Sequence, residues 1–424
     1  MLDIKFIRQN PEAVKEGCKK KNYHCDVDKL LEIDQKKIKI QQELEAIAAE
    51  KNKASKAIPQ AKDQSERENI INAMKALDQH VGELEKKAKE MEEEFDEIML
   101  SIPNIPFEDV PVGKDDSENV SIKQVGEKTK FDFESKDYLS IAEELDLIDV
   151  KRAAKISGSR FGFIKNEAAW LEFAIVRLVF DITTKKGFQP IIPPVMIKPE
   201  MALGMGFLEK LEGDPEAYYL QQDNQYLIAT AEQPLGAMHA DEVFKDSELP
   251  RRYLGFSTCF RREAGSYGKD TKGILRVHQF DKLEMFSFAR PEDSKAEHEL
   301  LLGLEEELMQ ALKIPYQVLK ICTGDLGRPA AAKYDIEAWV PSENKYRETH
   351  STSNCTDFQS RRLNIRYQDK NGKMNFVHTL NGTAFAIGRI IIAIIENCQQ
   401  ADGSILVPEV LHKYLPFTVI KKQS

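Results

Sequence analysis

The N-terminal part of the chain carries an apolar pattern with alternating steps of three and four residues, which is the spacing of a coiled coil. The pattern runs twice, and Pro59 with a polar run to Ser65 separates the two series. Two helices of about 30 residues joined by a short polar turn should form an antiparallel hairpin over about residues 28–99. Each helix would be roughly 45 Å long, and a hairpin so slender must project from a larger body. The positions in the two series are Leu30, Ile33, Lys37, Ile40, Leu44, Ile47, Lys51, Ala54 and Ile58, then Ile70, Met74, Leu77, Val81, Leu84, Ala88, Met91, Phe95 and Ile98.

The tip of this predicted hairpin is basic, whereas its base is acidic. Charges on a coiled coil are usually solvated faces, but Lys37 and Lys51 take core-spacing positions, where a lysine can bury its stem and keep its ammonium in water. The formal net charge is −10, so contact with a polyanion requires a local cationic patch. A basic tip on an acidic protein indicates a phosphate-bearing partner. The candidate residues are Lys51, Lys53, Lys56, Lys62 and Arg67.

A chain of 424 residues exceeds a typical single core. We expect an N-terminal domain over residues 1–102, a linker with prolines and acids over 103–130, and a larger domain over 131–424. No apolar run approaches the roughly 20 residues of a membrane span, and the N-terminus lacks a signal-peptide pattern, so the cytoplasm is favoured. Six cysteines without a CxxC pair argue against a disulfide framework and against a Cys-based zinc site.

In the larger domain, strand patterns outnumber crossover helices, which predicts an α+β fold with an antiparallel sheet flanked by helices. Pro193 and Pro194 confine the strand around them to a sheet edge or a bend. We interpret Asn381-Gly382-Thr383 as a turn between a strand and a buried helix. The chain has no GxGxxG and no Walker-type loop, so side chains would have to hold any nucleotide. The expected helices are 167–186, 291–313 and 384–398, and the expected strands are 188–196, 218–228, 255–262, 274–288, 316–322, 333–340 and 375–380.

The stretch from Gly255 to Phe288 is predicted to form a strand, a polar loop over 264–273 and a second strand. Charged residues near the middle of apolar strands are costly to bury unless they pair or meet a charged ligand. A hairpin with an exposed charged face would also explain them, but a polar pocket floored by an antiparallel sheet explains them better. The charged residues are Arg261, Arg262, Glu263, Arg276, His278, Asp281 and Glu284.

Three segments together resemble the class II aminoacyl-tRNA synthetases: GFQPIIPPV their motif 1, FRRE…RVHQFDKLEMF motif 2, and LNGTAFAIGR motif 3. With TAEQPL, YRETHSTSNCTDFQSRR and the N-terminal hairpin, the chain is similar over essentially its whole length to the seryl-tRNA synthetase family. This resemblance implies a ligase that activates L-serine with ATP and Mg²⁺ and then charges tRNA(Ser), and tRNA(Sec) where that tRNA is present. It also implies a cytoplasmic homodimer joined through residues 167–195, with no zinc, in which the hairpin grips the long variable arm of the tRNA.

In the ATP site, the resemblance assigns the catalytic charges to Arg261, on the α-phosphate and substrate carboxylate, and to Arg389, on the γ-phosphate. Arginine offers a planar fork that lysine lacks. Glu263 would recognise the adenine amino group, and Phe280 would stack on the ring. The oxygens of Glu348 and Ser351 would serve Mg²⁺, since hard oxygen ligands suit that ion. The ATP-binding set is Arg261, Arg262, Glu263, Val277, Phe280, Glu348, Thr349, His350, Ser351 and Arg389.

The amino acid site follows from the same resemblance, with Glu232 near the substrate amino group and Asn381 and Thr383 near its hydroxyl. Burying Glu232 and Glu284 beside Arg261 is explained by an ammonium ligand, although a structural ion-pair cluster is the alternative. The serine-binding set is Thr230, Ala231, Glu232, Arg261, Glu284, Asn381 and Thr383.

The chain departs from the family at two places. His350 stands where the family often has a small residue, and Thr383 where bacterial relatives commonly have serine. We expect His278 and His350 to support the site, and the loop 264–273 to cover ATP.

Two other functions are compatible with parts of this pattern. One is a ligase that activates an amino acid for a carrier protein, but relatives of that type lack the hairpin. The other is a coiled-coil scaffold with an inactive synthetase domain, in which loss of Arg261, Glu348 or Arg389 would be expected. All three residues are present.

Overall fold

The computed structural model describes residues 1–208, 216–264 and 272–422. The chain divides into two compact units, Met1–Pro103 and Asn104–Ser424. The roles that the sequence assigns to its domains stay predictions. Within the described residues, no helix is both long and apolar enough to cross a membrane.

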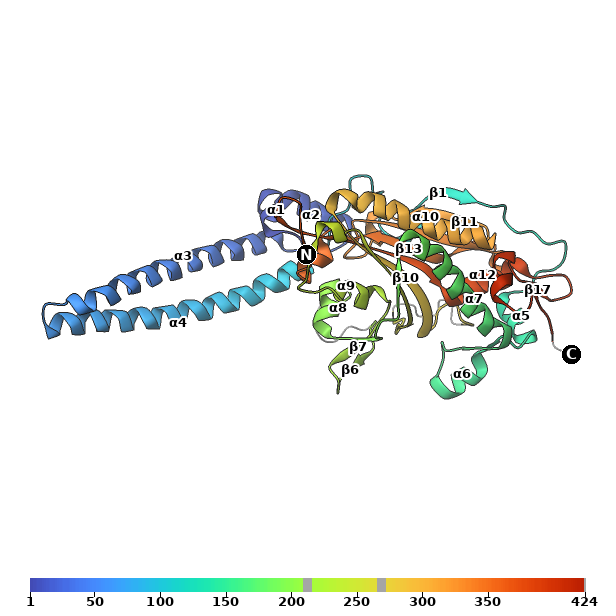
Figure 1. Ribbon diagram of the computed structural model, residues 1–424, viewed down its shortest axis with the longest axis horizontal. Coiled ribbons are helices and arrows are strands. Elements are labelled where there is room, and N and C mark those ends of the chain that lie inside the picture. Colours follow the sequence, from blue (N-terminus) through green and yellow to red (C-terminus); the bar gives the residue numbers. More distant parts are fainter. Residues whose placement is uncertain (209–215, 265–271, 423–424) are drawn as a thin grey trace. The chain divides into compact units, whose positions relative to one another are not determined.

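The first unit is helical, and Figure 1 shows its two long helices side by side as an antiparallel hairpin. The heptad positions are buried or half-buried along both helices, while most residues between them are exposed. The carboxylate of Asp26 accepts a hydrogen bond of 3.0 Å from the backbone N–H of Lys29 and so caps the start of the first long helix. The predicted coiled-coil arm is confirmed. The helices are α1 (Ile4–Gln9), α2 (Pro11–Lys20), α3 (Val27–Ala57), η1 (Ile58–Gln60) and α4 (Gln64–Ser101).

The second unit is built on an eight-stranded sheet. All neighbouring strands in it are antiparallel except the last pair, β9 and β4, which is parallel. The Pro-containing strand β4 lies at the edge, where a missing N–H costs no ladder bond. The predicted α+β class with an antiparallel sheet is confirmed. In spatial order the strands are β1 (Val120–Val125), β11 (Tyr316–Lys320), β12 (Ala332–Val340), β13 (Lys345–Asn354), β16 (His378–Ala386), β10 (Gln279–Ala289), β9 (Arg251–Phe260) and β4 (Gln189–Ile191).

The central strand β10 sends alternate side chains to two different faces, as a pleated strand must. Leu283 and Met285 join the core formed with the helices α7 (Asn166–Thr183), α10 (Ser294–Leu312) and α12 (Ile387–Cys398), which lie together over the sheet in Figure 1. Phe286 and Phe288 join a second core with residues of α8 (Pro199–Met205) and α9 (Glu232–Ala237). The remaining residues of that second face, Phe280, Lys282 and Glu284, line a cavity.

Smaller elements surround the sheet of this unit. They are η2 (Asp116–Glu118), α5 (Tyr138–Glu144), β2 (Ile148–Asp149), α6 (Val150–Ser157), β3 (Phe163–Ile164), η3 (Thr184–Lys186), β5 (Met196–Ile197), β6 (Tyr219–Leu220), β7 (Gln225–Leu227), β8 (Val243–Lys245), η4 (Asp246–Glu248), η5 (Pro291–Asp293), η6 (Thr323–Asp325), η7 (Pro341–Glu343), α11 (Phe358–Arg362), β14 (Arg366–Gln368), β15 (Met374–Phe376), β17 (Ile405–Leu406), η8 (Glu409–Tyr414) and β18 (Val419–Ile420).

The segment 103–130, expected to be a linker, contains the edge strand β1. The amide of Asn104 is buried and donates to the backbone oxygens of Pro329 and Cys355, each at 2.9 Å. From residue 104 onward this segment therefore belongs to the compact second unit. The polar composition that suggested a linker reflects an exposed sheet edge.

The interpretation of Asn381-Gly382-Thr383 as a turn is wrong, because these residues lie inside the strand β16. A Cβ atom at Gly382 would be 3.0 Å from Oε1 of Glu305 and 3.2 Å from Oγ1 of Thr352. Close approach of buried side chains, rather than a change of chain direction, explains this glycine. The second strand of the central hairpin also begins later than expected, at Gln279, and residues 265–271 of the expected ATP-covering loop lie outside the described residues.

Candidate active site

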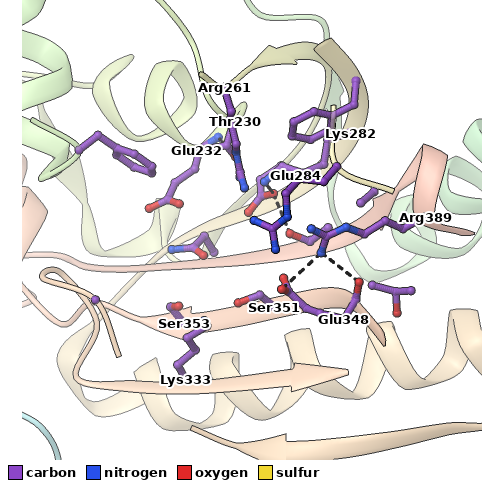
Figure 2. Close-up of a pocket in the computed structure, with 18 of the residues that line it drawn as sticks. Thr230, Glu232, Arg261, Lys282, Glu284, Lys333, Glu348, Ser351, Ser353 and Arg389 are labelled. Atoms are coloured by element: carbon purple, nitrogen blue, oxygen red, sulfur yellow. Dashed lines mark hydrogen bonds and ion pairs between the residues drawn. The ribbon is translucent and has the colours of Figure 1, made fainter. Parts of the chain in front are cut away.

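A cavity of about 410 Å³ opens on the face of the sheet that Phe280, Lys282 and Glu284 share. Figure 2 shows its walls, with side chains from several strands and from the start of α12 converging on one space. Residues far apart in the sequence are brought together here. The predicted site residues that line the cavity are Thr230, Glu232, Arg261, Glu263, Val277, Phe280, Glu284, Glu348, Thr349, Ser351, Asn381, Thr383 and Arg389.

Irregular strand pairing directs several of these side chains into the cavity. On β13, Ile336 pairs with His350 and Glu337 with Glu348, so Thr349 is an extra residue in the ladder. Because of this bulge, residues 348 and 351 both line the cavity although they are three apart. A second irregularity on β16, where Leu283 pairs with Phe385 and Glu284 with Thr383, has the same effect on residues 383 and 386.

One wall of the cavity is cationic. Arg261 follows directly after β9; its Nε lies 3.3 Å from the carbonyl oxygen of Ala229 and its guanidinium 5.3 Å from the centroid of the Phe280 ring. Arg389 lies in the first turn of α12, and Nη1 is 3.0 Å from the backbone oxygen of Glu348 and 3.3 Å from its Oε2. Both guanidinium groups reach the space drawn in Figure 2. Planar donor forks on one side of a cavity suit a polyphosphate.

Glu348 stands opposite these cations. Desolvation by the surrounding cavity alone would raise the pKa of its carboxyl, but the charges of Arg389, Lys333 and Arg261 outweigh this effect and hold the pKa at about 2. Its side chain is 49% exposed, on the cavity side. The carboxylate is therefore ionised at neutral pH and accessible to a ligand.

The other wall holds two buried carboxylates, Glu232 and Glu284. Burial, reinforced by the negative charge of Glu284, raises the pKa of Glu232 to about 7, while the Gln359 amide, which donates to Oε1 of Glu232 at 2.9 Å, opposes the rise. Oε2 of Glu284 accepts from the Thr383 hydroxyl at 3.2 Å and lies 2.6 Å from Nζ of Lys282. This end of the cavity is suited to an ammonium beside a small polar group.

Three predicted site residues lie outside the cavity lining. Ala231 is buried in the second core, with Phe286 and Phe288. Arg262 is exposed; its Nε donates to the carbonyl oxygen of Ala217 at 2.9 Å, and its guanidinium lies 4.9 Å from the centroid of the Tyr218 ring. The structure thus holds Arg262 against residues 217–218, away from the space where ATP was expected.

His350 is the third of these residues. Its imidazole is buried beside Phe385, with ring centroids 5.0 Å apart, and its Nδ1 is 2.8 Å from the Thr349 hydroxyl. Burial lowers the pKa of His350 to about 3, so the ring is neutral at physiological pH. Because Glu348 and Ser351 take the cavity side of β13, His350 supports the strand from the opposite side.

The supporting role expected for His278 agrees with its contacts. Its Nδ1 lies 2.9 Å from the carbonyl oxygen of Arg261, and its own carbonyl accepts from the Arg261 N–H at 2.9 Å. These two contacts fix the backbone that carries Arg261.

Several cavity residues were missed in the sequence. Lys282 could have been found by alternation, since it lies two residues before Glu284 on the same strand. Lys333 could have been found in the same way, since it lies two residues before Asp335 on one strand. The Nζ of Lys333 is 3.3 Å from Oδ2 of Asp335. Gln359 does not line the cavity but supports it from behind Glu232, and it gave no signal because that contact spans 127 residues.

The basic residues predicted at the tip of the hairpin lie at the end of α3, after η1 and at the start of α4. Lys53, Lys56, Lys62 and Arg67 are exposed. Lys51 instead forms an ion pair with Asp78 of the facing helix, and Lys37 pairs with Glu92 in the same way. The two lysines at core-spacing positions thus link the helices.

Several proteins resemble the chain from end to end. The serine–tRNA ligase of Treponema denticola is 45% identical over 98% of this chain and 99% of that protein, and that of Dictyoglomus turgidum is 46% identical over 99% of both. The crystal structure of seryl-tRNA synthetase from Pyrococcus horikoshii complexed with ATP matches 100% of both chains, with 41% identity and a TM-score of 0.94. The cytoplasmic serine–tRNA ligase from Naegleria fowleri in complex with AMP has 34% identity and a TM-score of 0.88, over 100% of this chain and 99% of that one.

Residues 218–398 match the family model of the tRNA synthetase class II core domain (G, H, P, S and T). With the antiparallel sheet and the paired arginines, this match defines the chain as a class II aminoacyl-tRNA synthetase. Residues 1–106 match the model of the seryl-tRNA synthetase N-terminal domain. Together with the full-length relatives, this shows that the chain belongs to the seryl-tRNA synthetase family.

Proposed function

We propose that this protein activates L-serine with ATP, forming seryl-adenylate and pyrophosphate, and then transfers serine to tRNA(Ser). The observation that carries the proposal is one cavity that brings together Arg261, Arg389 and the buried carboxylates Glu232 and Glu284. This combination matches a triphosphate beside the ammonium of an amino acid. The names of the relatives, and the ATP and AMP bound in two of their structures, support the same reaction. The same chemistry would serve transfer to tRNA(Sec) where that tRNA is present.

The residues suit this reaction without a general base, because the carboxylate of serine is already ionised. The serine ammonium would lie by Glu232 and Glu284, and its hydroxyl by Asn381 and Thr383. Arg261 would then hold the serine carboxylate and the α-phosphate together, which places the attacking oxygen close to phosphorus. As charge builds on the α-phosphate, the same guanidinium stabilises it.

Two further groups of residues would hold the rest of ATP. Arg389 would bind the γ-phosphate and so orient the departing pyrophosphate. Phe280 would stack on adenine, and Val277 and Thr349 would line the nucleotide space. Glu263, whose Oε2 is 3.0 Å from Nη1 of Arg276, would accept a hydrogen bond from the adenine amino group.

The residues present also fit Mg²⁺. In the described part of the chain, no three His, Cys, Asp or Glu side chains gather as a metal site, so protein ligands alone would not hold the ion. Glu348 is ionised and shares the cavity side of β13 with the Ser351 hydroxyl. Magnesium usually takes one or two protein oxygens and completes its shell with phosphates and water, and it would neutralise phosphate charge here.

We further propose a cytoplasmic homodimer. Large apolar side chains on α7 and beside β4 are exposed: Trp170 at 55%, Phe173 at 67% and Ile192 at 81%. An exposed apolar patch of this kind marks an association surface, and an isologous contact would bury it in both copies. Phe173→Glu should give a monomer in sedimentation velocity, and a variant that remains dimeric would place the interface elsewhere.

The test of the proposed reaction is ATP–pyrophosphate exchange with each of the twenty amino acids, followed by charging of tRNA. Exchange should depend on serine. Exchange with glycine or alanine but not serine would overturn the specificity. Exchange without charging would support the alternative of an amino acid ligase for another acceptor.

A further inference from the structure

Lys282 is a buried lysine inside the amino acid end of the cavity. Its side chain is 8% exposed, and its ammonium lies 2.6 Å from Oε2 of Glu284, which is itself 2% exposed. Figure 2 shows both side chains reaching the same part of the cavity from β10. A lysine is rarely buried unless it is paired, and separating this pair would leave an uncompensated charge.

The two carboxylates of this wall have different partners. Glu284 meets the Lys282 ammonium and the Thr383 hydroxyl through one oxygen, Oε2. Glu232 instead accepts from the neutral amide of Gln359. The Glu284 end of the wall therefore carries a balanced pair of charges, whereas the Glu232 end presents a carboxyl group beside a neutral donor.

Because of this difference, the α-ammonium and the side chain of a bound amino acid would meet different charges. An α-ammonium finds its counter-charge at Glu232, and the side-chain end meets the balanced cluster of Glu284, Lys282 and Thr383. A neutral hydroxyl can exchange hydrogen bonds with that cluster. A second ammonium would meet a carboxylate that already holds a cation, and like charges in contact strongly disfavour binding in a buried site.

We propose that Lys282 determines side-chain specificity: its ammonium balances Glu284, so that the pocket accepts a neutral hydroxyl and rejects a cationic side chain. The inference rests on the proposed function, because it assigns a task within serine selection. If Lys282 were only a structural partner of Glu284, its loss would lower stability and serine activation without changing which side chain is preferred.

L-2,3-Diaminopropionate separates these two roles, because it is serine with an amino group in place of the hydroxyl. Its activation is measured by ATP–pyrophosphate exchange at a pH at which its side-chain amine is protonated. Serine is measured in the same buffer, so that the protonation of Glu232, whose pKa is about 7, affects both substrates alike. Lys282→Met keeps the length of an unbranched chain and removes the charge, while Lys282→Arg keeps the charge and is the matched control. Thermal melting verifies that each variant is folded.

Lys282→Met should raise the ratio of kcat/KM for diaminopropionate over serine by about a hundredfold, since a few kcal/mol of repulsion is replaced by attraction. Lys282→Arg should keep the wild-type ratio. A folded Lys282→Met protein with an unchanged ratio overturns the inference. A raised ratio in Lys282→Arg also overturns it, because the effect would then not follow the charge.

The wild-type protein gives an independent test that needs no substitution. It should activate diaminopropionate at least about a hundredfold less well than serine. Comparable activation of the two overturns the role of Lys282 while leaving serine activation intact. Absence of serine-dependent exchange would instead contradict the proposed function itself.

Discussion

Arg261 and Arg262 are neighbours of identical chemistry that the structure directs to different places. Arg261 lines the cavity, whereas Arg262 is held against Ala217 and Tyr218. Removing one preorganised donor to a developing charge typically costs about 10²–10³ in rate, or roughly 3–4 kcal/mol. Arg261→Ala should therefore lower kcat/KM for serine-dependent ATP–pyrophosphate exchange by that factor.

Arg262→Ala removes one exposed side chain to backbone hydrogen bond and one exposed contact with a ring. Each is worth about 1 kcal/mol or less, and the loss falls on stability rather than on the cavity. Exchange should stay within about threefold of wild type, because the energy involved is a small fraction of a transition-state contact.

The assay compares kcat and KM for ATP and serine in both variants, with melting curves as the control for folding. A folded Arg262→Ala protein that loses as much activity as Arg261→Ala would refute the geometric argument and support the contact with ATP that the family resemblance assigns to Arg262. A loss of only a few-fold in folded Arg261→Ala would show that the cationic wall does not stabilise the reaction.

Three further predictions address the tip of the hairpin, the buried carboxyl of Glu232 and the strand β16. Changing Lys53 and Lys56 to glutamate should leave ATP–pyrophosphate exchange unchanged but weaken tRNA charging in a salt-dependent way, because phosphate contacts release counterions. Normal charging at moderate salt would show that these lysines are only solvated and do not contact tRNA. Because burial raises the pKa of Glu232 from 4.5 to about 7, the folded form binds the proton more tightly than the unfolded chain, and stability should fall as pH rises through that window. Glu232→Gln should remove this loss of unfolding free energy, which is at most roughly 3 kcal/mol. The measurement is urea unfolding of both proteins at the two ends of the pH window. If the unfolding free energy changes equally with pH in both proteins, the prediction is wrong. Gly382→Ala should destabilise the protein by about 1–3 kcal/mol in thermal melts, since the new Cβ would approach two buried side chains. Gly303→Ala, at an exposed position of helix α10 with nothing within 4 Å of the new Cβ, should be neutral or stabilising in the same melts.

The features that sequence reasoning predicted well depend on local periodicity. The heptads fixed the hairpin because every third and fourth residue must face the partner helix, and this holds regardless of the rest of the chain. Alternation on β10 would likewise have placed Phe280 and Glu284 on one face, although their roles were assigned from the family resemblance. The same rule would have found Lys282, whose position two residues from Glu284 was available in the sequence.

The features that sequence reasoning missed depend on contacts between distant segments. Gln359 reaches Glu232, and Asn104 reaches Pro329, only after the sheet and its helices have assembled. Gly382 was misread because glycine is common in turns, whereas here the space for a Cβ is taken by Glu305 and Thr352 from other elements. Local propensity contains no information about such neighbours.

The position of Glu348 and Ser351 was predictable in part from local spacing and in part only from the pairing of strands. Residues three apart on a regular strand point to opposite faces, so a shared task for both oxygens is incompatible with unbroken alternation. An extra residue between them removes the conflict, and the pairing of β13 with β12 contains that residue at Thr349. Spacing of this kind in a strand therefore predicts a bulge whenever two residues must reach one ligand. The same reasoning applied to His350 would have placed it on the opposite face, where the structure has it beside Phe385.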